Sequence, residues 1–274
     1  MAGTWFAQTI ASTVAPMLPG FTVEVVDAID STNSELMRRA RAGHTAPVLL
    51  VAERQTAGRG RMGRPWHSAQ DEAQPLTLTF SLGLPLAPSD WSGLSLAVGA
   101  SVADSLDADG RSGIRIKWPN DLWTADDRKL AGILIETATA ATAMTSAETA
   151  PAARYVVIGI GVNIGPRDGD GLRAPPACLQ ERTPAMTAPE ALRLIVAPLV
   201  RDVLAFGAHG FARFAARFTA RDALQGREIE LSDGTVGRCE GVGAAGELLV
   251  TTAAGLQPIT SSEVSVRPRR AEPS

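Results

Sequence analysis

Cysteine and histidine are scarce in this sequence, and neither is arranged for metal binding. Cys178 and Cys239 have no C-x-x-C spacing, and His44, His67 and His209 form no spaced cluster. A disulfide framework and a structural zinc site are therefore excluded, and both thiols are expected to be reduced. No G-x-S-x-G motif or cysteine–histidine arrangement supports nucleophilic hydrolysis.

Long apolar runs and an excess of basic charge are also missing. No apolar run reaches the roughly 18 residues that a transmembrane helix needs, and no basic segment precedes the apolar N-terminal stretch as it does in a signal peptide. The 26 basic and 29 acidic residues give a net charge of -3, which argues against a general nucleic-acid-binding protein. These absences predict a cytoplasmic protein that binds neither membrane nor DNA.

Apolar residues are nevertheless abundant enough for a large core, at 45% of 274 residues. That length suits one large domain, with or without a small second one. Apolar or alternating runs predict strands at residues 21–26, 48–52, 76–81, 114–118, 130–136 and 155–160. Helical spacing and N-cap residues predict helices at 34–41, 91–106 and 189–218, the last broken at Pro198 and at 207–210.

The remaining segments are expected to be loops, a loosely attached end and a small β module. Residues 1–20 predict a leader or a short helix that is only loosely attached, and residues 165–176 a Gly/Pro/Asp-rich loop. The Ala/Thr-rich residues 137–153 predict an elongated, flexible hairpin loop. After Leu224, short alternating runs and the hairpin signal Asp233-Gly234 predict a five-stranded, SH3-like barrel.

Three arginines lie on a glycine framework in residues 58–66, GRGRMGRPW. Arg59, Arg61 and Arg64 repel one another, so their clustering predicts an anion between them, although a solvated surface turn is the alternative. The string also matches G-x-G-x-x-G. A dinucleotide fold is not indicated, because Pro65 and Trp66 follow where a helix should begin and the expected downstream acid is absent.

Downstream side chains extend this predicted anion site. Lys117 and Lys129 lie on or beside apolar strands, so they either reach out to solvent or face an anionic ligand. Trp66 either belongs to the core or stacks on a purine. Asn120 and Asp121 form a turn signal, and Asp121 is also a candidate ligand for Mg²⁺.

Two further segments carry polar groups that could contact a small polar ligand. Ser31, Thr32 and Asn33 lie where the 34–41 helix begins, so they cap it, bind a polar ring, or do both. Asn163 follows a predicted buried strand in GIGVNIG, where glycines permit close approach of a ligand to the backbone. A structural turn is the alternative for Asn163.

As an ordered set, these segments closely resemble the biotin protein ligase family, also called biotin–[acetyl-CoA-carboxylase] ligases. The segments are Asp30–Asn33, Gln55 with Gly58–Trp66, Lys117–Asp121, Lys129–Leu134 and Gly159–Asn163, and the likeness covers residues 20–268. It implies an α+β fold in two domains. Residues 1–222 would form a mixed β-sheet flanked by helices, like class II synthetases and biotin–lipoate ligases, and residues 223–274 a small C-terminal SH3-like β-barrel.

The resemblance also assigns roles to individual residues. The residues expected to bind biotin are Ser31, Thr32, Asn33, Gln55, Gly58, Arg59, Gly60, Arg61, Lys129 and Gly132. Those expected to bind the nucleotide are Arg61, Arg64, Trp66, Lys117, Asn120 and Asn163, with Trp66 stacked on adenine. The implied catalytic residues are Arg59, Arg61, Lys117 and Lys129, and the implied metal ligand is Asp121.

The activity that the resemblance implies is that of an ATP- and Mg²⁺-dependent ligase. Biotin becomes biotinyl-5'-AMP with release of pyrophosphate, and is then transferred to a lysine of a biotin carboxyl carrier protein. The chain has about twenty residues before its first predicted strand, too few for the helix-turn-helix domain of bifunctional relatives, so no repressor function is expected. A monomer or weak homodimer is expected, and the rival functions are a lipoate or octanoate ligase and a non-catalytic biotin sensor.

Overall fold

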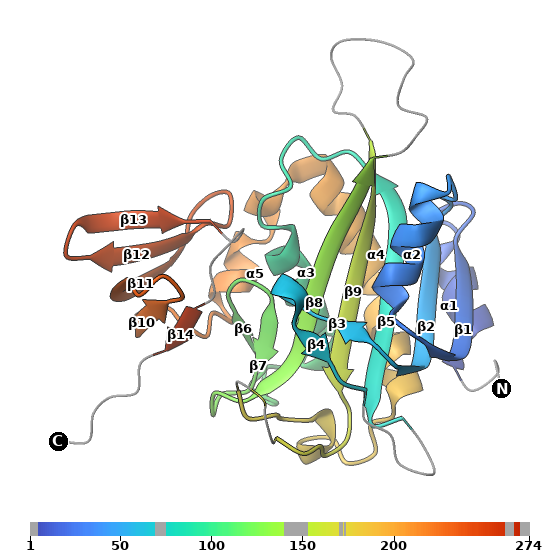
Figure 1. Ribbon diagram of the computed structural model, residues 1–274, viewed down its shortest axis with the longest axis horizontal. Helices are drawn as coiled ribbons and strands as arrows, with labels where there is room; N and C mark the ends of the chain where they lie inside the picture. Colours follow the sequence, from blue (N-terminus) through green and yellow to red (C-terminus); the bar gives the residue numbers. More distant parts are fainter. Residues whose placement is uncertain are drawn as a thin grey trace, which may run out of the picture.

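The six predicted strands and one that was not predicted, β7, assemble into a seven-stranded sheet in the order β1-β2-β5-β9-β8-β7-β6 (Figure 1). This computed structural model describes residues 5–68, 75–139, 153–169, 172, 174–260 and 266–268. The strands are β1 (Thr22–Ile29), β2 (Val48–Gln55), β5 (Thr77–Leu86), β6 (Arg115–Lys117), β7 (Asp121–Trp123), β8 (Lys129–Thr139) and β9 (Arg154–Asn163). β1 and β2 are parallel and the other neighbours antiparallel, so the sheet is mixed, as predicted.

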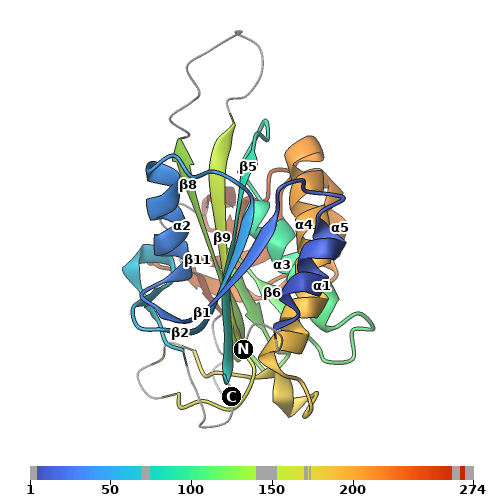
Figure 2. The same cartoon turned by 90° about the vertical axis from the view of Figure 1, so that its right-hand side faces the viewer.

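Helices cover both faces of this sheet, as the α+β prediction requires (Figure 2). On one face lie α1 (Ala7–Val14), α3 (Leu94–Leu106), α4 (Ala188–His209) and α5 (Ala215–Thr219), and on the other lies α2 (Thr32–Arg41). The apolar side chains of β2 alternate between the two faces of the sheet and so contribute to both cores. Leu49 and Val51 join the larger core, whereas Val48 and Leu50 pack with the smaller core under α2.

The prediction that the N-terminal segment is loosely attached is wrong. Helix α1 buries Ile10 and Val14 in the large core, and the Trp5 side chain is 2% exposed. The indole Nε1 of Trp5 donates a 2.9 Å hydrogen bond to Glu53 Oε1 on β2. The Ala/Thr-rich composition concealed three well-spaced apolar side chains, whose burial is enough to fix a short helix.

The predicted break at Pro198 is also wrong, because α4 runs through it from Ala188 to His209. A proline inside a helix removes one backbone hydrogen bond. Here Leu199 and Val200 on its C-terminal side, like Ile195 and Val196 before it, are fully buried, so packing on both sides of the proline offsets that loss. The helix ends at Gly210, within the predicted 207–210 break.

The β8–β9 hairpin is longer than predicted. Residues 137–139 continue β8 and pair with β9, whose first residue is Arg154. Backbone pairing with β9 extends the strand beyond the apolar run from which it was predicted. Residues 140–152, the rest of the expected hairpin loop, lie outside the described residues.

The C-terminal strands form a separate five-stranded antiparallel sheet in the order β13-β12-β11-β10-β14, compatible with the predicted SH3-like module (Figure 1). Its strands are β10 (Glu228–Leu231), β11 (Val236–Val242), β12 (Leu248–Thr252), β13 (Gly255–Ile259) and β14 (Val266–Pro268). The predicted hairpin turn joins β10 to β11, with Gly234 at a φ of 87°.

Two contacts join this second sheet to the edge of the first. Trp118 Nε1 donates to the Gly246 carbonyl at 3.1 Å, and Arg227 donates to both carboxylate oxygens of Asp127 at 2.7 Å. Trp118 directly follows β6, so the module is held beside the segment from which Lys117 projects. Among the described residues, no helix is long and apolar enough to cross a membrane.

Candidate functional site

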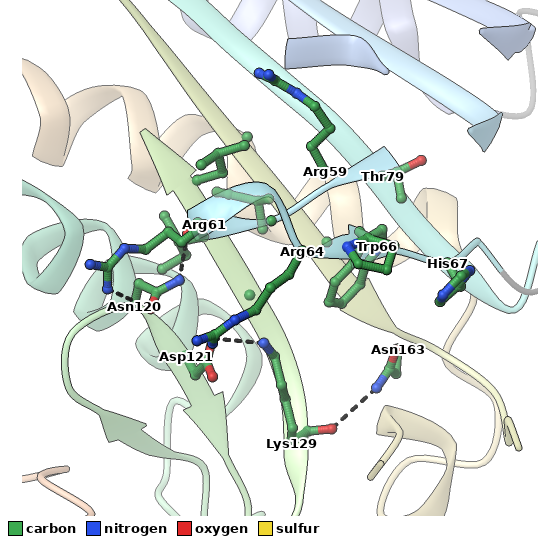
Figure 3. Close-up of a pocket in the computed structure, with 18 of the residues that line it drawn as sticks. Arg59, Arg61, Arg64, Trp66, His67, Thr79, Asn120, Asp121, Lys129 and Asn163 are labelled. Atoms are coloured by element: carbon green, nitrogen blue, oxygen red, sulfur yellow. Dashed lines mark hydrogen bonds and ion pairs between the residues drawn. The ribbon is translucent and has the colours of Figure 1, made fainter. Parts of the chain in front are cut away.

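One cavity of about 350 Å³ gathers nearly all the residues that the sequence singled out. It lies between the start of α2, the arginine loop (residues 58–66), the β6–β7 turn and strands β8 and β9 (Figure 3). The predicted residues lining it are Ser31, Thr32, Asn33, Gln55, Arg59, Gly60, Arg61, Arg64, Trp66, Lys117, Asn120, Asp121, Lys129, Gly132 and Asn163. Gly58 does not line it; a Cβ there would come within 2.4 Å of the Trp66 carbonyl oxygen.

The end of the cavity beside α2 is polar, buried and without net charge. Ser31 caps α2, and Thr32 donates to Gln55 Oε1 from its backbone nitrogen at 2.8 Å and from its hydroxyl at 3.1 Å. The Ser81 hydroxyl lies 2.7 Å from Thr32 Oγ1 and 2.6 Å from Asn33 Oδ1. Ser31, Thr32, Asn33 and Ser81 are each at most 3% exposed, so this end offers fixed neutral donors and acceptors.

The arginine loop folds back on itself in front of the sheet. Gly58 pairs with Trp66 in a short ladder of β3 (Gly58–Arg59) and β4 (Pro65–Trp66), and Gly60 N donates to the Arg64 carbonyl at 2.7 Å. The reversal uses left-handed backbone at Met62 and Gly63, with φ of 56° and 70°. Main-chain hydrogen bonds thus shape the loop, so its arginine side chains are available for other contacts.

The three arginines of the loop point in different directions (Figure 3). Arg59 donates to the Glu136 carboxylate on β8 at 2.6 and 2.7 Å. Arg61 donates to Asn120 Oδ1 at 3.3 Å, and Arg64 extends toward Asp121. Arg61 is half-buried, and burial lowers the pKa of its guanidinium. Arg61 and Arg64 therefore carry positive charge into the cavity, whereas Arg59 is neutralised by an acid.

Two lysines add charge opposite the loop. Lys129 Nζ lies 2.8 Å from Asp121 Oδ1, and the Lys117 side chain is buried with its Nζ 5.2 Å from the centre of the Trp123 ring. The pKa of Lys117 is lowered to about 8, chiefly by burial and also by repulsion from Lys129 and the loop arginines, while Asp121 opposes the change. Such strain on a buried cation is relieved when an anion binds beside it.

Trp66 lies flat against a pair of glycines on the central strands. Gly132 of β8 pairs with Gly161 of β9, and a Cβ on Gly161 would come within 2.3 Å of the indole ring. Lys129 Nζ and the Arg167 guanidinium each lie 5.8 Å from the ring centre. Among the described residues, the indole Nε1 is buried without a hydrogen-bond partner. The ring therefore belongs to the cavity wall and keeps one polar atom unused.

Both predicted asparagines are already engaged by protein groups. Asn120 Nδ2 donates to the Ile133 carbonyl at 2.8 Å, which anchors the β6–β7 turn to β8. Asn163 Nδ2 donates to the Lys129 and Ala177 carbonyls at 3.1 and 2.9 Å, and its Oδ1 accepts from Arg167 at 3.1 Å. In the structure both side chains hold neighbouring backbone carbonyls, and Asn163 also holds the Arg167 guanidinium. Direct contact of either side chain with a nucleotide stays a prediction.

Three residues of the site were missed from the sequence. Ser81 lies at the end of an alternation of threonine and serine on β5, a pattern that indicates one polar face. Glu136 is the one charged residue in the predicted apolar strand 130–136, and this was the only signal for it in the sequence. Arg167 follows Asn163 by four residues in a loop; it lines the cavity, burial lowers its pKa, and its Nε has no hydrogen-bond partner in the described part of the chain.

A protein-built metal centre is not present among the described residues, since no three His, Cys, Asp or Glu side chains gather to hold an ion. Asp121 is the one carboxylate that lines the cavity in the described part of the chain. A single carboxylate fits a Mg²⁺ ion that is carried mainly by substrate phosphates. The lining thus combines one acid with seven arginine and lysine side chains, of which Arg59 is paired with Glu136. The seven are Arg59, Arg61, Arg64, Lys117, Lys129, Arg167 and Arg267.

A known protein family matches the part of the chain that builds most of the cavity. Residues 25–163 match the biotin/lipoate A/B protein ligase family. The chain is 31% identical over 262 residues to the bifunctional ligase/repressor BirA of Escherichia coli, covering 94% of this chain and 78% of that protein. It is 32% identical over 245 residues to the biotin–[acetyl-CoA-carboxylase] ligase of Paracoccus denitrificans, covering 86% of this chain and 96% of that one.

Solved structures show the same architecture. The biotin protein ligase of Aquifex aeolicus in complex with biotin and ATP superposes with a TM-score of 0.73 at 26% identity, covering 90% of this chain and 99% of that one. The biotin acetyl coenzyme A carboxylase synthetase of Helicobacter pylori, with bound biotinylated ATP, gives 0.59 at 22% identity, covering 89% and 99%. The second likeness shows the fold alone.

Proposed function

Because this chain belongs to the biotin/lipoate A/B protein ligase family, we propose that its cavity joins biotin to ATP and then passes biotin to a protein lysine. One observation carries this proposal. A neutral, hydrogen-bonding end and a cluster of lysines and arginines share one cavity of about 350 Å³. The neutral end suits the uncharged ring of biotin, and the cationic end suits its carboxylate and the phosphates of ATP.

In the first half-reaction an oxygen of the biotin carboxylate attacks the α-phosphorus of ATP. The bond to the β-phosphate breaks, pyrophosphate leaves with the electron pair, and biotinyl-5'-AMP remains. Both reactants are anions, and at 4 Å one pair of charges repels by about 4 kcal/mol at an effective dielectric constant of 20. Arg61, Arg64, Lys117 and Lys129 offset this repulsion and stabilise the charge that develops on the phosphate. Positioning supplies the rest, and no protein nucleophile is needed.

At the neutral end, hydrogen bonds fix the groups that we assign to biotin. Ser31, Thr32 and Gln55 contact the ring, and Asn33 is held rigid beside them. Gly132 leaves room because a Cβ there would lie 3.2 Å from Lys129 Nζ. Lys129 lies between this end and the phosphates, where it can accompany the carboxylate into the reaction. The assignment of Gly58, Arg59 and Gly60 to biotin rests on the family resemblance alone.

At the cationic end we assign Arg61, Arg64, Lys117, Asn120 and Asn163 to the nucleotide, with Arg167 as an addition. Trp66 would offer adenine a flat surface on which to stack. Asp121 would hold Mg²⁺ together with the phosphates of ATP, and the ion would neutralise the leaving pyrophosphate when bound.

In the second half-reaction the ε-amine of a carrier lysine attacks the carbonyl carbon of biotinyl-AMP, an amide forms and AMP leaves. The carrier is the biotin carboxyl carrier domain of a carboxylase, of the acetyl-CoA carboxylase type that the relatives' names indicate. β7 pairs with β8 only as far as Gly132, and the backbone of Ile133 is hydrogen-bonded to Asn120 on that side. Among the described residues, the β8 edge therefore pairs with no strand on that side from Ile135 onward. That edge lies beside the cavity and can accept a strand of the carrier.

The wider cellular assignments rest on less specific features. We infer two domains, residues 1–222 and 223–274, in a monomer or weak homodimer that acts in the cytoplasm. The net charge of -3 supports the inference that DNA is not a partner.

The pH dependence of the first half-reaction should report Lys117. Its pKa in the free protein is about 8, below the ordinary 10.5, and only the protonated form attracts phosphate. We expect kcat/KM for ATP to fall as pH rises through about 8, because the charged fraction falls there. Bound phosphate favours the charged lysine, so the corresponding limb of kcat should lie at higher pH. If kcat/KM and kcat fell at the same pH, or if neither changed up to pH 9.5, Lys117 would not contact the phosphates.

Substitution of Gly161 by alanine tests the position of Trp66. The added methyl would displace the indole ring, which lies 2.3 Å from the Cβ position. We expect ATP to bind about tenfold more weakly, since stacking of a base on an aromatic ring contributes about 1–3 kcal/mol. Gly99→Ala in α3 is the matched control, with its nearest contact at 3.3 Å and no place in the cavity. Equal ATP affinity in both variants, measured by calorimetry, would contradict stacking on Trp66.

Competition between acids tests the substrate. Calorimetry should show biotin binding that neither lipoate nor octanoate displaces, because a rigid network of short hydrogen bonds suits a polar ring and not a flexible chain. Displacement by lipoate or octanoate at comparable concentration would favour the lipoate-ligase alternative. Biotin binding without pyrophosphate release from ATP would favour the sensor alternative.

A further inference from the structure

Glu136 lies outside every set of residues assigned above, yet it joins the two ends of the site. Its Oε2 accepts from Asn33 Nδ2 at 3.0 Å and from Arg59 NH2 at 2.6 Å, and its Oε1 accepts from the same arginine nitrogen at 2.7 Å. Asn33 belongs to the first turn of α2, and Arg59 to the arginine loop. One carboxylate on β8 thus connects the floor of the biotin end with the loop that closes over the nucleotide.

Asn33 is fixed from three sides at this junction. Ser81 donates to its Oδ1 at 2.6 Å, and its Nδ2 donates to the Leu134 carbonyl at 3.3 Å as well as to Glu136. Gly159 provides the space, since a Cβ there would come within 2.1 Å of Asn33 Oδ1. The orientation of the amide is therefore determined by hydrogen bonds, and Glu136 specifies which end carries the NH₂ group.

The charge of Arg59 already has a carboxylate partner, as that of Lys129 has in Asp121, but the partner of Arg59 lies on β8 outside the cavity lining. The Arg59 and Glu136 side chains are 44% and 27% exposed, and both carboxylate oxygens lie within 2.7 Å of the guanidinium. Arg61 instead donates to Asn120 Oδ1 in the β6–β7 turn (Figure 3). For Arg59 to contact a ligand carboxylate, it would have to leave Glu136 with an unpaired charge.

We propose that Glu136 is a positioning residue that holds the arginine loop, through Arg59, against the biotin end of the site. Arg59 acts through Glu136 and not by contact with the reacting atoms. The pair keeps the loop closed over biotinyl-AMP, so that Arg61 and Arg64 stay on the phosphate and water is excluded. The inference rests on the proposed function, because the retained molecule is the adenylate.

A double-mutant cycle on the off-rate of biotinyl-AMP tests this inference. We expect Glu136→Gln and Arg59→Gln each to raise the off-rate about fivefold, as loss of a partly exposed ion pair allows. The double variant should show the same fivefold increase, because both single changes break one contact. The control Glu24→Gln removes a carboxylate partner of Arg39 outside the cavity, and Arg39 keeps its contact with Glu35. That control should leave the off-rate unchanged.

The Glu136 carboxylate has two functions, the hydrogen bond to Asn33 and the ion pair with Arg59, and substitutions at position 136 can separate them. Glutamine at position 136 retains an oxygen acceptor for Asn33, whereas alanine does not. Biotin affinity should therefore be unchanged in Glu136→Gln and about fivefold weaker in Glu136→Ala, as the loss of one hydrogen bond allows. Equal unfolding midpoints of the two variants in urea establish that this difference arises at the site and not from general destabilisation.

Three results would overturn the proposal. They are an unchanged off-rate in Glu136→Gln, an Arg59→Gln effect at least tenfold larger than that of Glu136→Gln, and single effects that multiply in the double variant. The latter two would place Arg59 on the ligand itself. If the parent protein formed no biotinyl-AMP at all, the proposed function would be at fault and not the role of Glu136.

Discussion

Replacement of Lys117 by glutamine should lower the rate of biotinyl-AMP formation by about 10³-fold, in line with loss of one preorganised charge at a transition state. Lys117 is 8% exposed and shares its surroundings with Asp121, Lys129 and the loop arginines. A charge in such a buried site of low dielectric constant interacts strongly with a phosphate group that accumulates negative charge in the transition state. Single-turnover release of pyrophosphate at saturating biotin and ATP is the measurement, because it isolates the chemical step.

The same variant should not be less stable than the parent at pH 7. The folded pKa of Lys117 lies below its unfolded value of 10.5, so burial of the charged form costs stability below about pH 8 and the cost disappears as pH rises toward 10.5. A neutral glutamine removes that cost at every pH. Urea denaturation at pH 7 and at pH 10 checks the sign. A large loss of stability at pH 7 would mean that the lysine is structural, and a near-normal rate of pyrophosphate release would mean that it does not serve the phosphate.

Substitution of Arg61 by glycine should release biotinyl-AMP about 30-fold faster than the parent. Arg61 is a half-buried arginine of the loop that lines the cavity and contacts Asn120, and hydrogen bonds to charged groups contribute about 1.5–3 kcal/mol. The measurement is a chase of preformed, labelled adenylate with excess unlabelled biotin and ATP.

Glycine also loosens the loop backbone, so a second variant is needed. Arg61→Gln keeps a side chain and a Cβ but removes the charge, and it should show most of the 30-fold increase. A normal off-rate in Arg61→Gln with a fast one in Arg61→Gly would assign the effect to loop flexibility. Parental rates in both variants would remove Arg61 from the site.

Most of the basic residues of the cavity could be predicted from the sequence, because each of these lies in a sequence context that is unfavourable for a positive charge. Arginines crowded on glycines, and lysines such as Lys117 and Lys129 beside apolar strands, are unfavourable unless an anion binds. Six strands of the large sheet and α2 were also predicted correctly, because apolar alternation and the cap at Ser31 are local signals, whereas the short strand β7 was missed. The mixed sheet and the C-terminal β module followed from the family resemblance and the change of pattern after Leu224.

What the sequence concealed are partners far apart along the chain. Glu136 meets Arg59 across 77 residues, and Ser81 meets Asn33 across 48, so neither contact leaves a local pattern. The burial of Trp5 and the continuity of α4 through Pro198 likewise depend on tertiary packing, which overrides composition and propensity. Packing thus determined the elements that were predicted wrongly, and long-range hydrogen bonds determined the positions of Glu136 and Ser81 in the site.

The most direct test of the central claim is pyrophosphate release from Mg-ATP, measured with and without biotin and with and without a biotin carboxyl carrier domain. We expect release to require biotin, to stop near one equivalent per protein when the carrier is absent, and to become catalytic when it is added, with one biotin attached to one carrier lysine. Release that ignores biotin, or a carrier whose mass does not change, would contradict the account.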